Sequence, residues 1–160
     1  MFPRLCLASL VLASTLAGCA TPSAPVSVAG SIAANPSLST LNDLVGKAGL
    51  TETLNAPGPY TVFAPTNDAF KAVPAKTMDE LAHDPAKLKA VLAYHVLPGK
   101  TAAADIHNGS AKTLNGADLA LSRAGTFVTV EDAVVQDADI VASNGVVHVV
   151  DRVLIPPVKR

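Results

Sequence analysis

Residues 61–70 read TVFAPTNDAF, and this stretch predicts a strand, a turn and a helix in immediate succession. Its first three residues carry β-branched and aromatic side chains, which are typical of a strand, and Pro65 ends the run. Thr66 can cap the start of a helix, where a carboxylate on Asp68 suits the positive end of the helix dipole. The stretch therefore predicts a rigid corner, at which Asn67 or Asp68 can satisfy free backbone N–H groups.

Helical patterns lie on both sides of this corner. Upstream, residues 35–37 read NPS, which favours a helix start because Pro suits the first turn and Asn or Ser can cap it. Apolar side chains then recur at helical spacing up to residue 45, and a short second helix is expected over residues 50–54. Downstream, Thr77 and Glu80 have the spacing of a capping box, which predicts a helix start at Thr77.

A further helix is predicted to begin at Asp84, which can cap it, with Pro85 at its first position. This helix runs into Tyr94 and His95, at the point where the pattern changes from helix to strand. The polar tips of these two side chains can bond buried backbone groups while their rings pack.

After Gly99 the apolar residues come in short, partly alternating runs. Asn-Gly pairs at residues 108, 115 and 144 predict turns between them. The runs that we predict as strands are Ala111–Leu114, Leu119–Ser122, Phe127–Val130, Ile140–Ala142 and Val146–Val150, followed by a tail at Val153–Ile155. Helices in the first half and strands in the second predict an α+β fold.

The bulk composition disfavours several classes of function. The length of 160 residues suits one compact domain. A net charge of -1 without a run of Lys or Arg argues against nucleic-acid binding. Aromatic residues make up 4% with no Trp, so ring platforms for bases or sugars are poorly supported. Cys6 and Cys19 both precede the domain, which is expected to fold without a disulfide.

Residues 1–19 read MFPRLCLASLVLASTLAGC and have the three-part pattern of a secretory signal. The apolar stretch is too short to span a bilayer core of roughly 30 Å. The closing LAGC resembles a bacterial lipobox, which implies that Cys19 carries the lipid after cleavage. Because Ala20 follows, and not the Asp that resembles an inner-membrane retention signal, we expect an exported protein anchored in the outer membrane, facing the periplasm or the cell surface. The alternative is an ordinary cleaved signal with an incidental Cys.

Three blocks of sequence, in order, resemble the fasciclin domain. They are TVFAPTNDAF at residues 61–70, YHVLPG at residues 94–99 and NGVVHVVDRVL at residues 144–154. The resemblance implies a compact β-wedge or sandwich of about seven strands, with helices packed around it that come mostly from the N-terminal half. It also implies an adhesion or interaction role that needs no cofactor. In animal members the segment near the Tyr-His pair has been linked to receptor binding, so Tyr94 and His95 are candidates for a contact role or a structural one.

These signals divide the chain into three parts. Residues 1–18 form the predicted lipoprotein signal peptide, residues 19–30 the lipidated Cys19 with a flexible linker, and residues 31–157 the fasciclin-like domain. The linker is inferred from the small, Pro- and Ser-containing composition of residues 20–28. We expect the domain to be a monomer that is held at the membrane by its lipid.

The histidines do not suggest a metal site, because the sequence has no short-spaced pair, no HExxH and no CxxC. His148 shares a strand face with apolar neighbours, which favours a hydrogen-bonded core histidine, and we interpret His95 in the same way. His83 and His107 are expected to be exposed. We therefore expect neither a metal nor another cofactor.

No Gly-x-Ser-x-Gly nucleophile elbow occurs, and Asp68 with Asp151 could act as acid and base only if the fold brought them together. We predict a non-catalytic, membrane-anchored extracytoplasmic module that binds a protein or a polysaccharide. The alternative is a periplasmic small-molecule-binding or stress-related protein, including an enzyme of unrecognised type. A deep pocket with converging polar groups would favour the alternative, and a filled core with an exposed apolar patch the first hypothesis.

Overall fold

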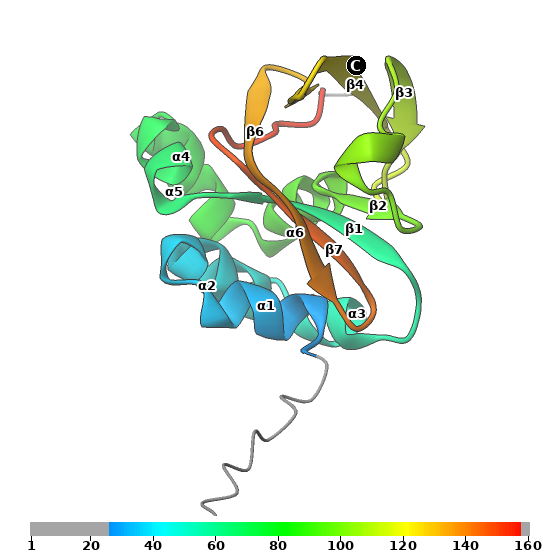
Figure 1. Ribbon diagram of the computed structural model, residues 1–160. Helices are drawn as coiled ribbons and strands as arrows, with labels where there is room; N and C mark the ends of the chain where they lie inside the picture. The colour runs from blue at the N-terminus through cyan, green and yellow to red at the C-terminus, as the bar shows by residue number, and fades with distance from the viewer. Residues whose placement is uncertain (1–25, 158–160) are drawn as a thin grey trace, which may run out of the picture.

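The computed structural model describes residues 26–157 (Figure 1), so the predicted signal peptide at residues 1–18 and the predicted lipidation site Cys19 lie outside it. The helices are α1 (Val28–Ala34), α2 (Ser39–Lys47), α3 (Thr51–Asn55), α4 (Asn67–Ala72), α5 (Ala75–His83) and α6 (Pro85–Tyr94), with 3₁₀ turns η1 (Pro36–Leu38) and η2 (Ala103–Asp105). The strands are β1 (Tyr60–Pro65), β2 (Val96–Pro98), β3 (Gly109–Lys112), β4 (Asp118–Ala124), β5 (Phe127–Val130), β6 (Ala133–Ala142) and β7 (Gly145–Val150).

The described strands form one seven-stranded sheet in the order β2-β1-β7-β6-β5-β4-β3. β1 and β7 are parallel, and the other neighbouring strands are antiparallel. The sheet curls until it is nearly closed, since the N–H of Leu114, just after β3, donates to the carbonyl of Val96 in β2 at 2.9 Å. The helices come from the N-terminal half and gather on one side (Figure 1), which confirms the predicted α+β wedge.

The neighbouring strands β1 and β7 are buried on both faces. On one face Val62 and Val147 join the core that the sheet shares with the helices. On the other face Phe63 and Val150 join a second core, enclosed by the curled strands. Burial on both faces explains why these strands read as nearly continuous apolar runs rather than as alternating ones.

The folded domain begins earlier than the predicted boundary at residue 31. α1 begins at Val28, after a Ser27 cap whose hydroxyl accepts from the N–H of Gly30 at 3.2 Å. Val28 and Ile32 are buried in the helical core. The predicted extent of the linker, residues 19–30, was therefore wrong at its end, because small and polar neighbours concealed a short amphipathic helix.

Most of the predicted helix starts are confirmed by their caps. The Asn35 side chain accepts from the N–H of Ser37 at the start of η1, and Thr66 caps α4. Asp84 caps α6, accepting from two backbone N–H groups at 3.0 and 3.1 Å. In each case a short polar side chain satisfies donors that the helix itself leaves free.

The predicted capping box at Thr77 and Glu80 is wrong. α5 begins at Ala75, directly after Pro74, and Thr77 lies inside the helix. No side chain caps this helix. Pro74 holds the N-cap position, and its carbonyl accepts from the N–H groups of Thr77 and Met78, so the first turn lies ahead of the Thr–Glu pair.

The predicted strands all have counterparts, but β6 is much longer than expected. It runs from Ala133 to Ala142, whereas only Ile140–Ala142 was predicted. Its register against β7 shifts twice between Val135 and Ile140, and Asp139 has a φ of 58°. These irregularities break the alternation on which the sequence prediction depended. The tail at residues 153–155 is not a strand, although Leu154 is buried.

Candidate functional site

The residues that the sequence singled out divide into an interior group and a surface pair. Tyr94, His95 and His148 gather around Phe63 of β1. The Phe63 N–H donates to the His95 carbonyl at 2.8 Å, and its ring stacks on His148 with centroids 5.6 Å apart. Asn67 and Asp68 lie at the surface instead, in the first turn of α4.

His95 is 2% exposed and bonds only backbone groups with its ring. Its Nδ1 lies 2.8 Å from the Val91 carbonyl, which can only accept, so Nδ1 carries the proton. Its Nε2 accepts from the N–H of Leu154 at 3.0 Å. Burial lowers the pKa of His95 from 6.5 to about 4, although the bond to Val91 opposes this shift. The imidazole is therefore a neutral link between the end of α6 and the C-terminal tail.

Tyr94 is buried, and its hydroxyl makes the polar contacts of the side chain. That hydroxyl lies 3.1 Å from the Asp118 carbonyl and 3.0 Å from a carboxylate oxygen of Glu131. The same Glu131 oxygen also accepts from the N–H of Ala120 at 3.1 Å. Burial, together with the bond to Glu131, raises the pKa of Tyr94 to about 12. Tyr94 thus joins α6 to the β4–β6 half of the sheet.

His148 is fully buried and joins β7 to the loop that follows β2. Its Nδ1 accepts from the N–H of Asp139 at 3.1 Å, so Nε2 carries the proton and donates to the Thr101 carbonyl at 2.9 Å. The N–H of Thr101 in turn donates to the buried hydroxyl of Thr61 at 2.8 Å. The Asp139 carboxylate accepts from the N–H of Ala103 at 2.7 Å. This network fixes the loop against β1 and β6.

Asn67 ties α4 to the start of α2. Its Oδ1 accepts from the N–H of Thr40 at 3.0 Å, and its Nδ2 donates to the Pro36 carbonyl at 3.1 Å. The Ser39 hydroxyl lies within hydrogen-bond distance of both amide atoms. Since α2 has no side-chain cap at its own N-terminus, Asn67 supplies one from another helix. The sequence predicted that Asn67 would satisfy free N–H groups at its own corner, but there Thr66 caps α4, and the Asn67 side chain serves the start of α2.

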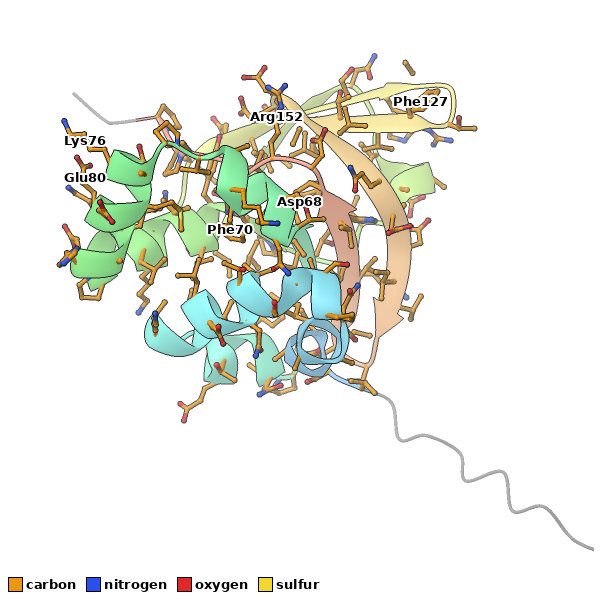
Figure 2. The ribbon with its side chains drawn as sticks, turned by 90° about the vertical axis from the view of Figure 1, so that its left-hand side faces the viewer. Asp68, Phe70, Lys76, Glu80, Phe127 and Arg152 are labelled. Atoms are coloured by element: carbon orange, nitrogen blue, oxygen red, sulfur yellow. The ribbon has the colours of Figure 1, made fainter. Side chains whose placement is uncertain are left out.

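Asp68 points outward, and Figure 2 shows it at the surface of α4 while Phe70 on the same helix turns inward. Its carboxylate lies 2.8 Å from the Lys71 ammonium, and both side chains are largely exposed. The hydrogen bond to Asp68 raises the pKa of Lys71. An exposed pair of this kind adds little to the stability of the fold.

The surface pair lines an open hollow of about 470 Å³, which we call the Asn67 hollow. Its lining residues are Pro36, Ser37, Thr66, Asn67, Asp68, Lys71, Gln136 and Asp151. The fold thus brings Asp68 and Asp151 to one place. However, Asp68 pairs with Lys71, and Asp151 accepts from the N–H of Val134 at 2.8 Å. Each carboxylate already has a partner within the domain, which suits a polar contact surface better than an acid–base pair.

Within residues 26–157, no group of three or more His, Cys, Asp and Glu side chains is arranged so that it could hold a metal ion. Among the same residues, none of the helices has the length and apolar character that crossing a membrane requires.

The family model for the fasciclin domain matches residues 36–156. The chain belongs to the fasciclin domain family. This confirms the resemblance carried by the three sequence blocks. The fasciclin domain is typical of cell surface or adhesion proteins, and its family is generally non-catalytic.

Curated relatives support the membership of this chain in the fasciclin domain family. The chain is 47% identical over 127 residues to Protein sll1483 of Synechocystis sp., covering 78% of this chain and 71% of that protein. It is 40% identical over 158 residues to the cell surface glycolipoprotein MPB83 of Mycobacterium bovis, covering 88% of this chain and 71% of that protein. It is 39% identical over 151 residues to the immunogenic protein MPB70 of the same species, covering 86% of this chain and 77% of that protein.

A solved structure of a FAS1 domain pair, from the insect cell adhesion molecule fasciclin I, has the same fold as this fasciclin domain. The TM-score is 0.64 at 17% identity, over 81% of this chain. The match covers 50% of the insect chain, so this chain spans half of that structure. At this identity the likeness concerns the fold alone.

Proposed function

We propose that this fasciclin domain is a membrane-anchored, extracytoplasmic interaction module that binds a protein or polysaccharide partner of the cell envelope without catalysing a reaction. The observation that carries the proposal is the 40% identity to a cell surface glycolipoprotein, together with the lipobox-like LAGC that ends at Cys19. The Asn67 hollow is the proposed contact surface, because its exposed charges and amides lie on a rigid, hydrogen-bonded corner. The proposed location is the outer membrane, with the domain facing either the periplasm or the cell surface.

Anchoring is tested by replacing Cys19 with serine. We expect the wild-type chain, expressed in a bacterium that processes lipoproteins, to partition with membranes and into detergent. Only a thiol can take the lipid at this position, and two or more acyl chains hold stably because each buried CH₂ contributes about 0.8 kcal/mol. The Cys19→Ser chain should move to the soluble fraction. An unchanged partition would show that the lipid anchor is wrong.

Partner binding is tested by pull-down from the native envelope with the lipid-free domain. We expect wild type to retain a specific protein or polysaccharide, and the variants Asp68→Ala and Gln136→Ala to lose most of that retention. Both positions line the Asn67 hollow, while Asp68 contributes only an exposed ion pair to the fold. Their melting temperatures should therefore stay close to that of wild type.

The matched control is Glu80→Ala, which removes an exposed carboxylate from α5, away from the hollow (Figure 2). It should bind as wild type does. If Asp68→Ala, Gln136→Ala and Glu80→Ala all retained the same partner equally, the binding surface would lie elsewhere on the domain.

A further inference from the structure

The chain joins the folded domain at Val26, beside the turn between β6 and β7. The Val26 carbonyl accepts from the N–H of Ser143 at 2.8 Å. Two residues later, the N–H of Val28 donates to the side-chain oxygen of Asn144 at 2.8 Å. The start of the domain is therefore fixed to this turn at one end of the sheet, where Figure 1 shows α1, α3 and the lower ends of β6 and β7 together.

Asn144 also holds two neighbouring segments at the same end. Its Nδ2 donates to the carbonyls of Leu54 and Ala56, at 2.7 and 3.0 Å, where α3 ends. Its own carbonyl accepts from the N–H of Tyr60 at 3.0 Å. One partly buried amide thus positions the loop between α3 and β1 against the β6–β7 turn.

The loop before Lys100 completes this end of the domain, since the Gly99 N–H donates to the Pro59 carbonyl at 2.8 Å. These segments surround an open hollow of about 580 Å³. We define the anchor pole as Val26 with the residues that line this hollow: Asn55, Pro57, Gly58, Pro59, Lys100, Ala142, Ser143, Asn144 and Gly145.

The chemistry of the anchor pole suits an anionic, partly apolar surface. The residues that line its hollow include one cation, Lys100, and no carboxylate. Lys100 is exposed, and Val26 is 47% exposed although it is apolar. Prolines and asparagines make up half of the remaining lining, and the rest are small residues. A lysine on a flexible apolar stem can reach lipid phosphates from such a surface.

The opposite end of the domain has a different character. Phe127, 68% exposed, stands at the β4–β5 hairpin, which Figures 1 and 2 both place at the far side from the start of α1. A hollow of about 250 Å³ at that end is lined by Glu131 and Asp132 as well as by Arg152. Two carboxylates there would be repelled by an anionic bilayer, whereas Lys100 at the anchor pole would be attracted.

The distance from Cys19 to Val26 limits how the domain can stand on a membrane. Residue 26 follows residue 19 by seven positions, and a chain of that length spans at most about 25 Å in any conformation. A globular domain of roughly 130 residues has a radius of gyration of about 14 Å, hence a diameter of about 36 Å. If Cys19 carries the lipid, the anchor pole therefore lies within about 25 Å of the bilayer, and the domain cannot stand on its β4–β5 end with the pole about 36 Å above the membrane.

We propose that the anchor pole docks on the headgroup surface of the bilayer that holds the Cys19 lipid, with Lys100 against the lipid phosphates. The β4–β5 hairpin then faces away from the membrane. This orientation rests on the proposed lipid anchor and adds to it a defined membrane-facing surface. It follows that a partner in the envelope meets the sides and the far end of the domain, not the pole.

The orientation is tested with a fluorophore on single cysteines. After acylation of Cys19 and removal of the leader with Cys6, an introduced cysteine is the one free thiol of the mature chain. The full-length lipidated variants Ser143→Cys and Phe127→Cys are labelled and reconstituted into phosphatidylcholine–phosphatidylglycerol vesicles with a headgroup nitroxide quencher. We expect severalfold more quenching at position 143 than at position 127.

Two further variants address Lys100, both in the Ser143→Cys background. Lys100→Glu should reduce quenching at position 143 in vesicles that contain phosphatidylglycerol. Lys76→Glu makes the same charge change on α5 and should leave the quenching unchanged. Equal effects of the two substitutions, or no effect of either, would refute the contact between Lys100 and lipid phosphate.

Flotation of the same vesicles separates the two proposals. Protein that floats but shows equal quenching at positions 143 and 127 would overturn the orientation and leave the anchor in place. Protein that fails to float would refute the anchor, and with it the orientation.

Discussion

Replacing Gly145 with alanine is expected to lower the free energy of unfolding by roughly 4–5 kcal/mol, or to prevent folding altogether. Gly145 begins β7 and lies opposite Tyr60 of β1 in the parallel pair. A Cβ at Gly145 would overlap the Tyr60 carbonyl oxygen and would lie 2.8 Å from its carbon and 3.0 Å from the Tyr60 nitrogen. These atoms are backbone, so no change of rotamer relieves the overlap, and β1 and β7 must separate.

The matched control is Gly46→Ala in α2. A Cβ there meets nothing within 4 Å, and the position is exposed and helical. That substitution should leave stability unchanged or raise it by up to about 1 kcal/mol, because alanine loses less backbone entropy than glycine. Urea denaturation of the domain measures both changes. A Gly145→Ala protein within about 1 kcal/mol of wild type would mean that the close approach of β1 and β7 is not maintained in solution.

Gly145 also shows what the sequence could predict about the fold and what it could not. The Asn-Gly pair at residues 144 and 145 predicted a turn, and the turn is present between β6 and β7. The reason for the glycine is different, however, since Gly145 is not among the residues with positive φ, unlike Gly116 at 80°. The requirement comes from Tyr60, far away in sequence, and local turn preferences carry no information about such a contact.

The strand–turn–helix corner was predictable because its interactions are local. The caps at Thr66 and Asp84 involve residues two or three positions away, so spacing in the sequence was sufficient. Helix α1 was missed because its stability depends on long-range packing of Val28 and Ile32, not on a strong local signal.

The same distinction applies to the candidate site. Tyr94 and His95 could be recognised as residues whose polar tips bond backbone, but the sequence could not name their partners. Glu131 and Asp139 were missed, although Glu131 holds the Tyr94 hydroxyl and Asp139 holds His148. Both have positive φ, at 54° for Glu131 in the turn between β5 and β6 and at 58° for Asp139 within β6, and the sequence gives no sign of either conformation. Only a map of tertiary contacts would have identified them.

The second large effect concerns pH. We expect the free energy of unfolding to fall by about 3 kcal/mol between pH 7 and pH 4 because of His95 alone. Its pKa is about 4 in the folded domain, below the ordinary value of 6.5, because burial disfavours the charged ring. Between these values the unfolded chain binds a proton that the folded one does not. The stabilising contribution is therefore complete above pH 6.5 and is lost as the pH falls towards 4.

Comparison with His95→Ala isolates this contribution from that of other titrating groups. At pH 7 the variant should be less stable by about 1–3 kcal/mol, because the Val91 carbonyl and the Leu154 N–H lose their buried partner. The variant has no His95 to protonate, so it does not lose this part of its stability as the pH falls. The difference in free energy of unfolding between it and wild type should therefore narrow. His107→Ala, at an exposed position, should follow the wild-type curve.

Urea titrations of the three proteins from pH 7 to pH 4 measure this convergence. If the difference in free energy of unfolding between wild type and His95→Ala stayed constant over this range, the pH dependence of wild type could not come from a neutral, desolvated imidazole at His95. If the variant kept full stability but no longer retained the envelope partner, His95 would be a contact residue instead. The hydrogen bonds of its ring to Val91 and Leu154 favour the structural role, because they occupy both nitrogens inside the core and leave neither for a partner.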